Sequence, residues 1–417
     1  MRRVVNSGVP GYWLRELVGP GRSCIPDAGE TGFGSSFVMT FSEKLVRLNE
    51  EKSALLSRFE RLLAPQSAAQ LEAMAGEAAA LTRQYFGRTM RLFAPLYLSN
   101  ECINSCAYCG FSRENSIFRV TLSVDEVVRE GEHLVGQGFR HVLLVAGEHP
   151  KFVSSGYLER CLRALRDRIP SLGIEVGPME TSDYAALAGA GAETLVVYQE
   201  TYDRENYAAL HTSGPKRDFD WRLECPERGY AGGFRRIGIG ALFGLREWRA
   251  EALSLAAHLE YLQKRCWKAA FTVAFPRLRP AAGGFVPGHM VSDREFVQML
   301  CAFRLCFPHA GIVMSTREPA ALRDAVVPLG VTLMSAGSHT EPGGYTGEGR
   351  SDLHLTVKGR RVEIDQHNHA AGGATAQFEI SDHRSALQVA NSLRARGFDP
   401  VWKDWDESLS SAAAASA

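Results

Sequence analysis

The sequence predicts an α/β protein built around a (β/α)8 TIM-type barrel, with an N-terminal helical extension and a C-terminal cap of loop and helix. Two observations lead to this fold class. Short apolar, β-branched runs alternate with amphipathic stretches, which is the pattern of parallel strands joined by helices. Eight such runs occur, and eight strands close a barrel. An open doubly wound sheet would use the same unit, so closure is inferred from the count.

The segments before the barrel are expected to form a tail and a helical cap. Residues 1–38 are rich in Gly, Ser and Pro and lack periodicity, which predicts a flexible tail. An upstream start codon mistaken for the true one is the alternative. Residues 39–90 carry apolar residues at spacings of three and four, with a break at Pro65. This pattern predicts the helices of an N-terminal cap.

The predicted barrel domain spans residues 91–342. Its strands are expected at residues 92–99, 141–147, 174–179, 194–200, 236–244, 270–277, 311–318 and 331–338. Barrels of this type place their chemistry at the C-terminal ends of the strands, so the polar residues that end these runs are candidates for the mouth. They are Tyr97, Glu148, Glu180, Gln199, Glu200, Arg277, Arg317, Ser335 and Ser338.

Residues 343–417 lose the alternating pattern. Residues 343–385 are expected to form a mobile loop or a small hairpin, and a last helix is expected from Ser385 to Gly397. The phrase PVWKDWD at residues 400–406 and an Ala/Ser-rich tail follow.

Charge and hydropathy limit the class of partner. Lys plus Arg total 47 and Asp plus Glu total 47, so no excess charge favours nucleic acid or an anionic membrane. No window approaches about 18 uninterrupted apolar residues, and the N-terminus lacks the apolar core and cleavage site of a signal peptide. We therefore expect a cytoplasmic protein with a small-molecule ligand.

Three of the nine cysteines form a tight group. Cys102, Cys106 and Cys109 lie in ECINSCAYCGF, directly after the first predicted strand, where a loop can bend three thiolates toward one centre. A zinc site would use four ligands, and no His or fourth Cys follows at finger-like spacing. The polar neighbours within the phrase argue against three buried small hydrophobes. The trio therefore predicts an iron-sulfur cluster with one iron left open.

The spacing C-x3-C-x2-C, with Tyr108 before the last cysteine and a strand before the loop, resembles the radical S-adenosylmethionine (SAM) superfamily. The resemblance implies a [4Fe-4S] cluster whose open iron is chelated by the amino and carboxylate groups of SAM. It also implies reductive cleavage of SAM to methionine and a 5'-deoxyadenosyl radical, inside a barrel that keeps the radical away from water.

Other phrases are similar to SAM-binding motifs of that superfamily. Gly147 and Glu148, in LVAGEHP, match the motif that accepts hydrogen bonds from the SAM amino group. Arg217, in KRDFDWRL, matches the position of an Arg for the SAM carboxylate, with Arg222 as a rival. The glycine-rich RIGIGALFG resembles the strand that lets adenine approach the backbone. Singly, each of these is also an ordinary loop charge or packing glycine. The residues that the resemblance assigns to SAM are Tyr108, Gly147, Glu148, Gln199, Arg217 and Gly240.

From about Met39 onward the chain resembles the 2-iminoacetate synthases of thiamine biosynthesis, also called tyrosine lyases. The matching phrases are TRQYFGRTM, PLYLSNECINSCAYCGF, HVLLVAGEHP, YQETYDRENY, DFDWRLECPERGYAGG, FPRLRP, STREP, PGGY, QFEISDHRS and PVWKDWD, and their order carries the resemblance. It implies cleavage of the Cα–Cβ bond of L-tyrosine after hydrogen abstraction from its amino group. The products would be 2-iminoacetate (dehydroglycine), which passes to the thiazole synthase, and p-cresol. A flavodoxin- or ferredoxin-type reductant is implied as well.

The same resemblance assigns substrate-binding residues. Arg317, in STREP, matches the Arg placed against the substrate carboxylate, and a guanidinium can supply a bidentate fork. Tyr97 and Ser335 match other pocket positions. The alternatives are a salt bridge from Arg317 to Glu318 or a neighbour, and core packing for Tyr97. The exact role of Gln199 stays open, and further mouth residues receive no role; they are Glu200, Tyr202, Arg277 and Arg279.

The segment from Leu353 to Ala376 looks longer than is usual in the family. It contains His367 and His369, which are interpreted as solvated loop residues and not as a metal pair, because no third ligand is in sequence reach. Three rivals remain. A hydrogenase-maturase tyrosine lyase would carry a C-terminal cysteine motif, and no cysteine follows Cys306. A tryptophan lyase is opposed by PVWKDWD and GGY, and a non-catalytic iron-sulfur electron carrier would want four cysteines per cluster.

Overall fold

The computed structural model describes residues 52–362 and 373–402. All described residues belong to one compact unit, Met39–Ala417. The predicted tail at residues 1–38, the pair His367 and His369, and the residues after 402 lie outside the described part. The predicted domain boundaries remain predictions.

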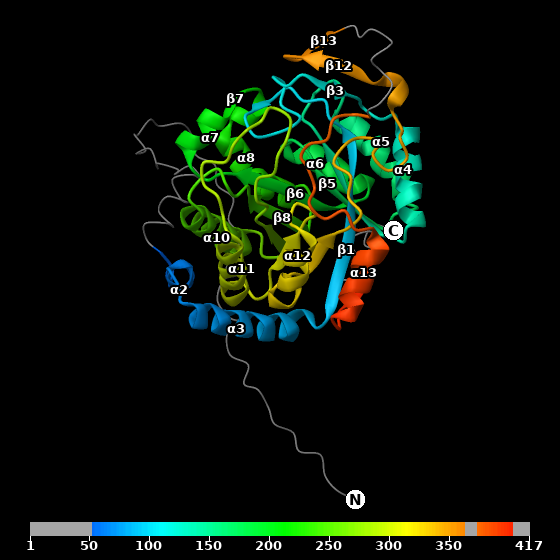
Figure 1. Cartoon of the computed structure of the whole chain (residues 1–417). Helices are drawn as coiled ribbons and strands as arrows, with labels where there is room; N and C mark the ends of the chain where they lie inside the picture. Colours follow the sequence, from blue (N-terminus) through cyan, green and yellow to red (C-terminus); the bar gives the residue numbers. More distant parts are fainter. Residues whose placement is uncertain (1–51, 363–372, 403–417) are drawn as a thin grey trace, which may run out of the picture. The chain divides into compact units, whose positions relative to one another are not determined.

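Eight parallel strands close into a barrel (Figure 1). They are β1 (Thr89–Ser99), β4 (His141–Ala146), β5 (Ser171–Glu175), β6 (Ala192–Glu200), β8 (Arg236–Ala241), β9 (Ala270–Ala274), β10 (Gly311–Met314) and β11 (Leu333–Ser335). Neighbours pair in this order, and β11 returns to β1 through Arg91 opposite Leu333 and Phe93 opposite Ser335. The predicted closed barrel and its eight strands are therefore confirmed, and the open sheet is excluded.

One predicted strand is displaced along the chain. The run expected at residues 174–179 is a strand at Ser171–Glu175 instead. Gly177 and Pro178 follow, and proline cannot donate to a parallel ladder, so the strand ends before them. As a result Glu175, which the sequence pattern did not place at a strand end, is the last residue of β5.

Helices surround the strands, and several of them begin at side-chain caps. The outer elements are α4 (Val124–Gly136), α5 (Ser155–Leu165), α6 (Thr181–Ala190), α7 (Arg204–Leu210), η1 (Pro215–Arg217), α8 (Phe219–Leu223), α9 (Cys225–Ala231), α10 (Trp248–Arg265), α11 (Asp293–Cys306), α12 (Ala320–Val326) and η2 (Val327–Leu329). Ser123 and Glu126 form a capping box on α4, as Ser292 and Glu295 do on α11. The main apolar core lies between these helices and the strands, and a smaller cluster that includes Phe93, Leu143 and Val196 fills the barrel interior.

The N-terminal extension is helical, as predicted, over its described part. The helix α2 (Ala54–Leu63) ends before Pro65, and α3 (Ala68–Phe86) begins at the cap Ser67. Both pack against α11, where Phe59 contacts the rings of Phe303 and Phe307 at centroid distances of 4.8 and 6.1 Å. Aromatic contacts of this kind bury large apolar surfaces and fix the extension to the barrel.

The C-terminal segment returns to the barrel. A hairpin of β12 (His354–Val357) and β13 (Arg360–Val362) follows η3 (Arg350–Asp352), and β12 pairs with β3 (Ile117–Arg119), so the predicted small hairpin is present. The predicted last helix is α13 (Ala386–Ala395), after which β14 (Asp399–Val401) adds to β1.

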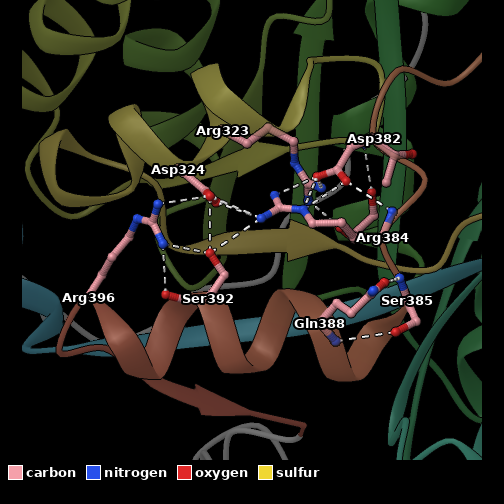
Figure 2. A network of polar contacts seen from close by, with 10 residues as sticks. Arg323, Asp324, Asp382, Arg384, Ser385, Gln388, Ser392 and Arg396 are labelled. Carbon is pink, nitrogen blue, oxygen red and sulfur yellow. Dashed lines mark hydrogen bonds and ion pairs between the residues drawn. The ribbon is translucent and has the colours of Figure 1, made fainter.

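A network of ion pairs joins α13 and the segment before it to α12 (Figure 2). Arg323 and Asp382 form a fully buried pair, with side chains 0% and 1% exposed. Arg384 lies 2.7 Å from Asp382 and 3.0 Å from Asp324, and Arg396 also lies 3.0 Å from Asp324. Because Arg323 also donates to the carbonyl of Ser335 at the end of β11, the network ties residues 382–396 to the barrel mouth.

Candidate active site at the carboxyl end of the barrel

A cavity opens at the C-terminal end of the strands. Five of the predicted mouth residues line it, namely Tyr97, Glu200, Arg317, Ser335 and Ser338. Cys109 and Tyr108 of the cysteine loop line the same cavity, so this loop and the predicted substrate residues meet in one space. Three other predicted mouth residues do not line it: Glu148 lies in the loop after β4, Glu180 is the exposed N-cap residue of α6, and Arg277 is turned toward Glu318.

Backbone pairing positions the cysteine loop. Ser105 and Cys106 form the short strand β2 (Ser105–Cys106), which pairs antiparallel with β7 (His211–Ser213). Ala107 N–H donates to the carbonyl of Leu210 at 3.0 Å. Gly214, with a φ of 87°, lies so close to the loop that a Cβ there would come within 2.3 Å of the Asn104 Oδ1. A side chain at position 214 would therefore displace the loop.

The donor set of this loop fits an iron-sulfur cluster better than a single metal ion. The described residues contain no group of three His, Cys, Asp or Glu side chains that could hold one ion. A four-iron cluster binds each thiolate to a different iron, so its ligands need not converge on one point. Two amides face the sulfurs: Asn104 Nδ2 lies 3.7 Å from Cys102 Sγ, and Gln377 Nε2 lies 3.9 Å from Cys109 Sγ. Donors of this kind tune a cluster's potential.

One carboxylate beside the cysteines is paired with two cations. Glu200 ends β6 with a φ of 73°, and its Oε1 lies 2.7 Å from Lys216 Nζ and 3.5 Å from Arg222 Nη2. Burial acts to raise the pKa of Glu200, but the two cations outweigh it and hold the pKa below its usual value. A non-glycine residue at positive φ is strained, and such strain is typical of functional sites.

The loop after β4 is bonded to the cysteine loop. Gly147 has no room for a side chain, because a Cβ would come within 2.3 Å of the Glu101 carbonyl oxygen. The carboxylate of Glu148 accepts from Asn104 Nδ2 at 2.7 Å, and its carbonyl accepts from Ile103 N–H at 2.9 Å. Gly147 and Glu148 thus lie beside the cysteines, where their predicted role requires them.

The remaining predicted SAM contacts differ in position. Gly240 faces the barrel interior, where a Cβ would come within 2.4 Å of the Ala274 carbonyl oxygen. Gln199 is buried and donates to the carbonyl of Phe219 at 3.4 Å, outside the cavity. Arg217 is exposed and does not line the cavity, whereas its neighbour Lys216 does and the rival Arg222 is buried.

Tyr108 is held by a histidine. Its hydroxyl lies 2.7 Å from His211 Nε2, and His211 Nδ1 lies 2.8 Å from the carbonyl of Tyr207. A carbonyl only accepts, so Nδ1 carries the proton and Nε2 accepts from the Tyr108 hydroxyl. Burial lowers the pKa of His211 to about 3, which keeps this neutral form.

Arg317 occupies the cavity without an anionic partner. Its guanidinium carbon lies 3.3 Å from the ring centroid of Phe378, and no ion pair joins it to any residue in 52–362 or 373–402. The alternative salt bridge to Glu318 is wrong, because Glu318 binds Arg277 and, at 2.9 Å, Arg279. Burial lowers the pKa of Arg317, so the site favours an anionic ligand that would compensate its charge.

The other two predicted substrate residues lie beside Arg317. Tyr97 donates its hydroxyl to Gln377 Oε1 at 2.8 Å and meets Phe111 edge to face at 5.9 Å. It is thus both part of the interior cluster and a cavity residue. Ser335 Oγ accepts from Thr316 N–H at 3.1 Å.

Sequence reasoning missed three cavity residues. Glu175 was missed because its strand was placed too late. Gln377 and Phe378 belong to the phrase QFEISDHRS, which resembled the family but received no role. Their position depends on the return of the C-terminal segment to the mouth, which no local pattern encodes.

No helix within the described residues is long and apolar enough to cross a membrane.

Comparisons with known proteins cover most of the chain. Residues 96–256 match the Radical SAM superfamily and residues 274–399 match the Biotin and Thiamin Synthesis associated domain. The chain is 43% identical over 349 residues to the 2-iminoacetate synthase of Escherichia coli (strain K12), covering 84% of this chain and 86% of that protein. Identity to the Salmonella typhimurium enzyme is 42%, with the same coverage. The structure of the FeFe-hydrogenase maturase HydG from Carboxydothermus hydrogenoformans is similar at a TM-score of 0.74 and 34% identity, covering 87% of this chain and 79% of that one.

Proposed function

Because this chain belongs to the 2-iminoacetate synthase family of radical SAM lyases, we propose that its barrel cavity holds SAM and L-tyrosine side by side and cleaves the tyrosine Cα–Cβ bond. The products are 2-iminoacetate and p-cresol, with 5'-deoxyadenosine and methionine from SAM. The observation that carries the proposal is Arg317, a partly buried guanidinium that forms no ion pair with any described residue, in a cavity that Cys109 also lines.

The cofactor side of the cavity is formed by the cysteine loop. Cys102, Cys106 and Cys109 are the proposed cluster ligands, and the neighbouring Gly147 and Glu148 are proposed to receive the SAM amino group. When bound, the reduced cluster and SAM supply the 5'-deoxyadenosyl radical that removes a hydrogen atom from the substrate. Burial raises the thiol pKa of Cys106 and Cys109, and the positive charge of Lys216 beside them opposes this rise.

Arg217 and Arg222 are the two candidates for the cation that binds the SAM carboxylate. Arg217 matches the superfamily motif but is exposed, while Arg222 is buried and already donates its Nε to the carbonyl of Tyr198 at 2.7 Å. We propose Arg217 for this role, which requires its exposed side chain to turn toward the cysteine loop. Tyr108, Gln199 and Gly240 complete the proposed SAM site.

The substrate side is formed by Arg317, Tyr97 and Ser335. The guanidinium supplies two parallel donors for the tyrosine carboxylate, and the stack on Phe378 fixes the plane of the fork. Tyr97 is oriented by its hydrogen bond to Gln377, which also donates toward Cys109. One amide thus connects the substrate side to the cysteine loop, and the closed barrel excludes water from the space between them.

The likeness to HydG favours a second candidate, a tyrosine lyase that acts as a hydrogenase maturase. The first cleavage would be the same, and only the fate of the imine would differ. We propose the thiamine branch because the chain is more similar in sequence to the 2-iminoacetate synthases, at 43% identity against 34%. Since the imine hydrolyses in water, a thiazole synthase that consumes it is the proposed partner, and a flavodoxin- or ferredoxin-type protein is the proposed reductant.

One experiment tests the proposal. The purified protein is reconstituted anaerobically with iron and sulfide and then given SAM, dithionite and tyrosine. We expect p-cresol, glyoxylate from hydrolysis of the imine, and 5'-deoxyadenosine, each identified by mass. Stoichiometric cyanide or carbon monoxide would assign the protein to the maturase branch, and a preference for tryptophan would reject tyrosine as the substrate.

A further inference from the structure

The acidic groups that line the cavity differ in their partners. Three carboxylates line it, namely Glu175, Glu200 and Glu318. Two of them are each held by two cations: Glu200 by Lys216 and Arg222, and Glu318 by Arg277 and Arg279. The third carboxylate, Glu175, forms no hydrogen bond or ion pair with its side chain among the residues that the structure describes.

Glu175 lies level with the predicted substrate residues. Its register partner on β4 is Val145, and the register partner of Val145 on β1 is Tyr97. Tyr97, Val145 and Glu175 therefore stand at one height on three neighbouring strands, and alternation turns all three side chains into the cavity. A carboxylate without a hydrogen-bond or ion-pair partner inside a cavity costs free energy unless a bound ligand compensates its charge.

The charges around Glu175 come from several elements. They are Tyr97 on β1, Tyr198 and Glu200 on β6, Lys216 on η1, Arg222 on α8 and Arg317 after β10. Burial and the charge of Glu200 raise the pKa of Glu175 to about 7, while the three cations act to lower it. At neutral pH this carboxyl group can therefore both release and accept a proton.

The charged groups of the cavity that form no ion pair are complementary to the two charges of an amino-acid zwitterion. Within the described residues, Arg317 is a cation that forms no ion pair, and Glu175 is an acid that forms none. We propose that Glu175 pairs with the amino group of the substrate and accepts one proton from it while Arg317 holds the carboxylate; this rests on the function proposed above. The proton moves from the substrate nitrogen to a Glu175 carboxylate oxygen, and no electron is transferred. The amine that remains is neutral and keeps two N–H bonds, one of which can then lose a hydrogen atom.

The first test compares tyrosine with an analogue that lacks the amine. Wild-type and Glu175→Gln enzymes, both reconstituted and supplied with SAM, are examined by equilibrium dialysis with tyrosine and with 3-(4-hydroxyphenyl)propionate. Removing the charge should weaken tyrosine binding by about tenfold or more and change binding of the analogue by less than about twofold. Equal weakening of both ligands would overturn the proposal, because Glu175 would then face the phenol or act on the shape of the cavity.

The second test is the pH profile of p-cresol formation. Glu175 must be ionised to accept the proton, so wild-type kcat/KM should rise with pH through about 7. In Glu175→Gln this limb should disappear, and the residual rate should rise only at higher pH, where the free substrate amine is already neutral. Glu175→Asp keeps a carboxylate and should keep the limb at a lower rate. A limb that survives in Glu175→Gln would overturn the proton transfer.

Glu251→Gln is a matched control. Glu251 is a buried glutamate on α10 whose pKa burial likewise raises to about 7, but it accepts from Thr201 Oγ1 at 2.8 Å and from Tyr202 N–H at 2.7 Å, outside the cavity. Its replacement should leave tyrosine affinity and the pH profile unchanged. If the wild-type enzyme binds tyrosine but forms no p-cresol, the proposed function fails, whereas the affinity comparison still decides the role of Glu175.

Discussion

Replacing Arg317 by alanine should separate substrate binding from cofactor chemistry. The guanidinium lines the cavity, stacks on Phe378 and has no ion pair among the described residues, so its removal breaks no ion pair within them. The cluster and SAM should bind as in the wild type. The tyrosine carboxylate, in contrast, would lose its cation inside the cavity.

The expected size of the effect follows from this geometry. Leaving one member of a buried charge pair without its partner costs about 2 to 5 kcal/mol. At about 1.4 kcal/mol per factor of ten, kcat/KM for tyrosine should fall by about 30-fold to several thousand-fold. Water that enters the space left by the side chain would partly hydrate the carboxylate and move the result toward the smaller value. Arg317→Lys should recover only part of the loss, because an ammonium group cannot reproduce the planar fork.

The assay is p-cresol formation measured together with 5'-deoxyadenosine. Arg317→Ala should keep the iron content and uncoupled cleavage of SAM while losing at least about tenfold in p-cresol. Arg396→Ala, which removes an arginine paired with Asp324 on the far side of α12, serves as the control and should retain activity. Tyrosine turnover at the wild-type rate in Arg317→Ala would refute the reasoning. Arg277 and Arg279 could not then simply replace Arg317, because Glu318 already binds both.

The cysteine loop, the ion-pair network and the hairpin contact each give a further test. Alanine at any one of the three loop cysteines should abolish the iron-sulfur absorbance and 5'-deoxyadenosine formation, and a redox-active cluster that survives would reject the ligand assignment; serine should be tolerated at the other cysteines. Asp382→Ala leaves Arg323 buried without its anionic partner and should lower the free energy of unfolding by about 3 to 5 kcal/mol, measured by denaturant titration; an unchanged value would show that water or another group compensates Arg323. Glu101, at 2.8 Å, raises the pKa of His354, so this pair's stabilisation is fully present below the unfolded pKa of about 6.5 and is lost as pH rises through the raised folded value. His354→Gln should therefore remove a pH-dependent part of the unfolding free energy, and an identical pH dependence in the variant would show that the pair contributes nothing.

The barrel could be predicted from the sequence because its signal is local. Each strand is a short apolar run between turn residues, and all eight runs pair in the predicted order of a closed barrel. The error at β5 also has a local cause, since IEVGPM contains apolar residues that lie beyond the end of the strand. Because of that small displacement, Glu175 was not identified as a strand-end residue. Glu175 is important because it is in register with Val145 and because its side chain forms no hydrogen bond or ion pair among the described residues.

The rest of the site depends on contacts between distant segments. The cysteine trio and Arg317 were found from motifs, but no motif indicated that Lys216 would pair with Glu200 while Arg217 turns to solvent. Gln377 is 280 residues from Tyr97 and 268 from Cys109, and only the folded chain brings the three together. The sequence could identify QFEISDHRS, the phrase that contains Gln377, as part of the family resemblance. It could not predict where Gln377 lies in the folded chain.

Both matched regions contribute to the site. The radical SAM region, residues 96–256, supplies the cysteines and the loops that bind them, and the second region, residues 274–399, supplies Arg317, Ser335, Gln377 and Phe378. The two halves of the barrel meet where β1 closes on β11 and where Gln377 reaches both Tyr97 and Cys109. The ion pairs of Figure 2 hold residues 382–396, which follow Gln377 in the second region, against α12. Substrate specificity within such a barrel should therefore depend on both regions, because Tyr97 and Glu175 lie in the first and Arg317 and Ser335 in the second.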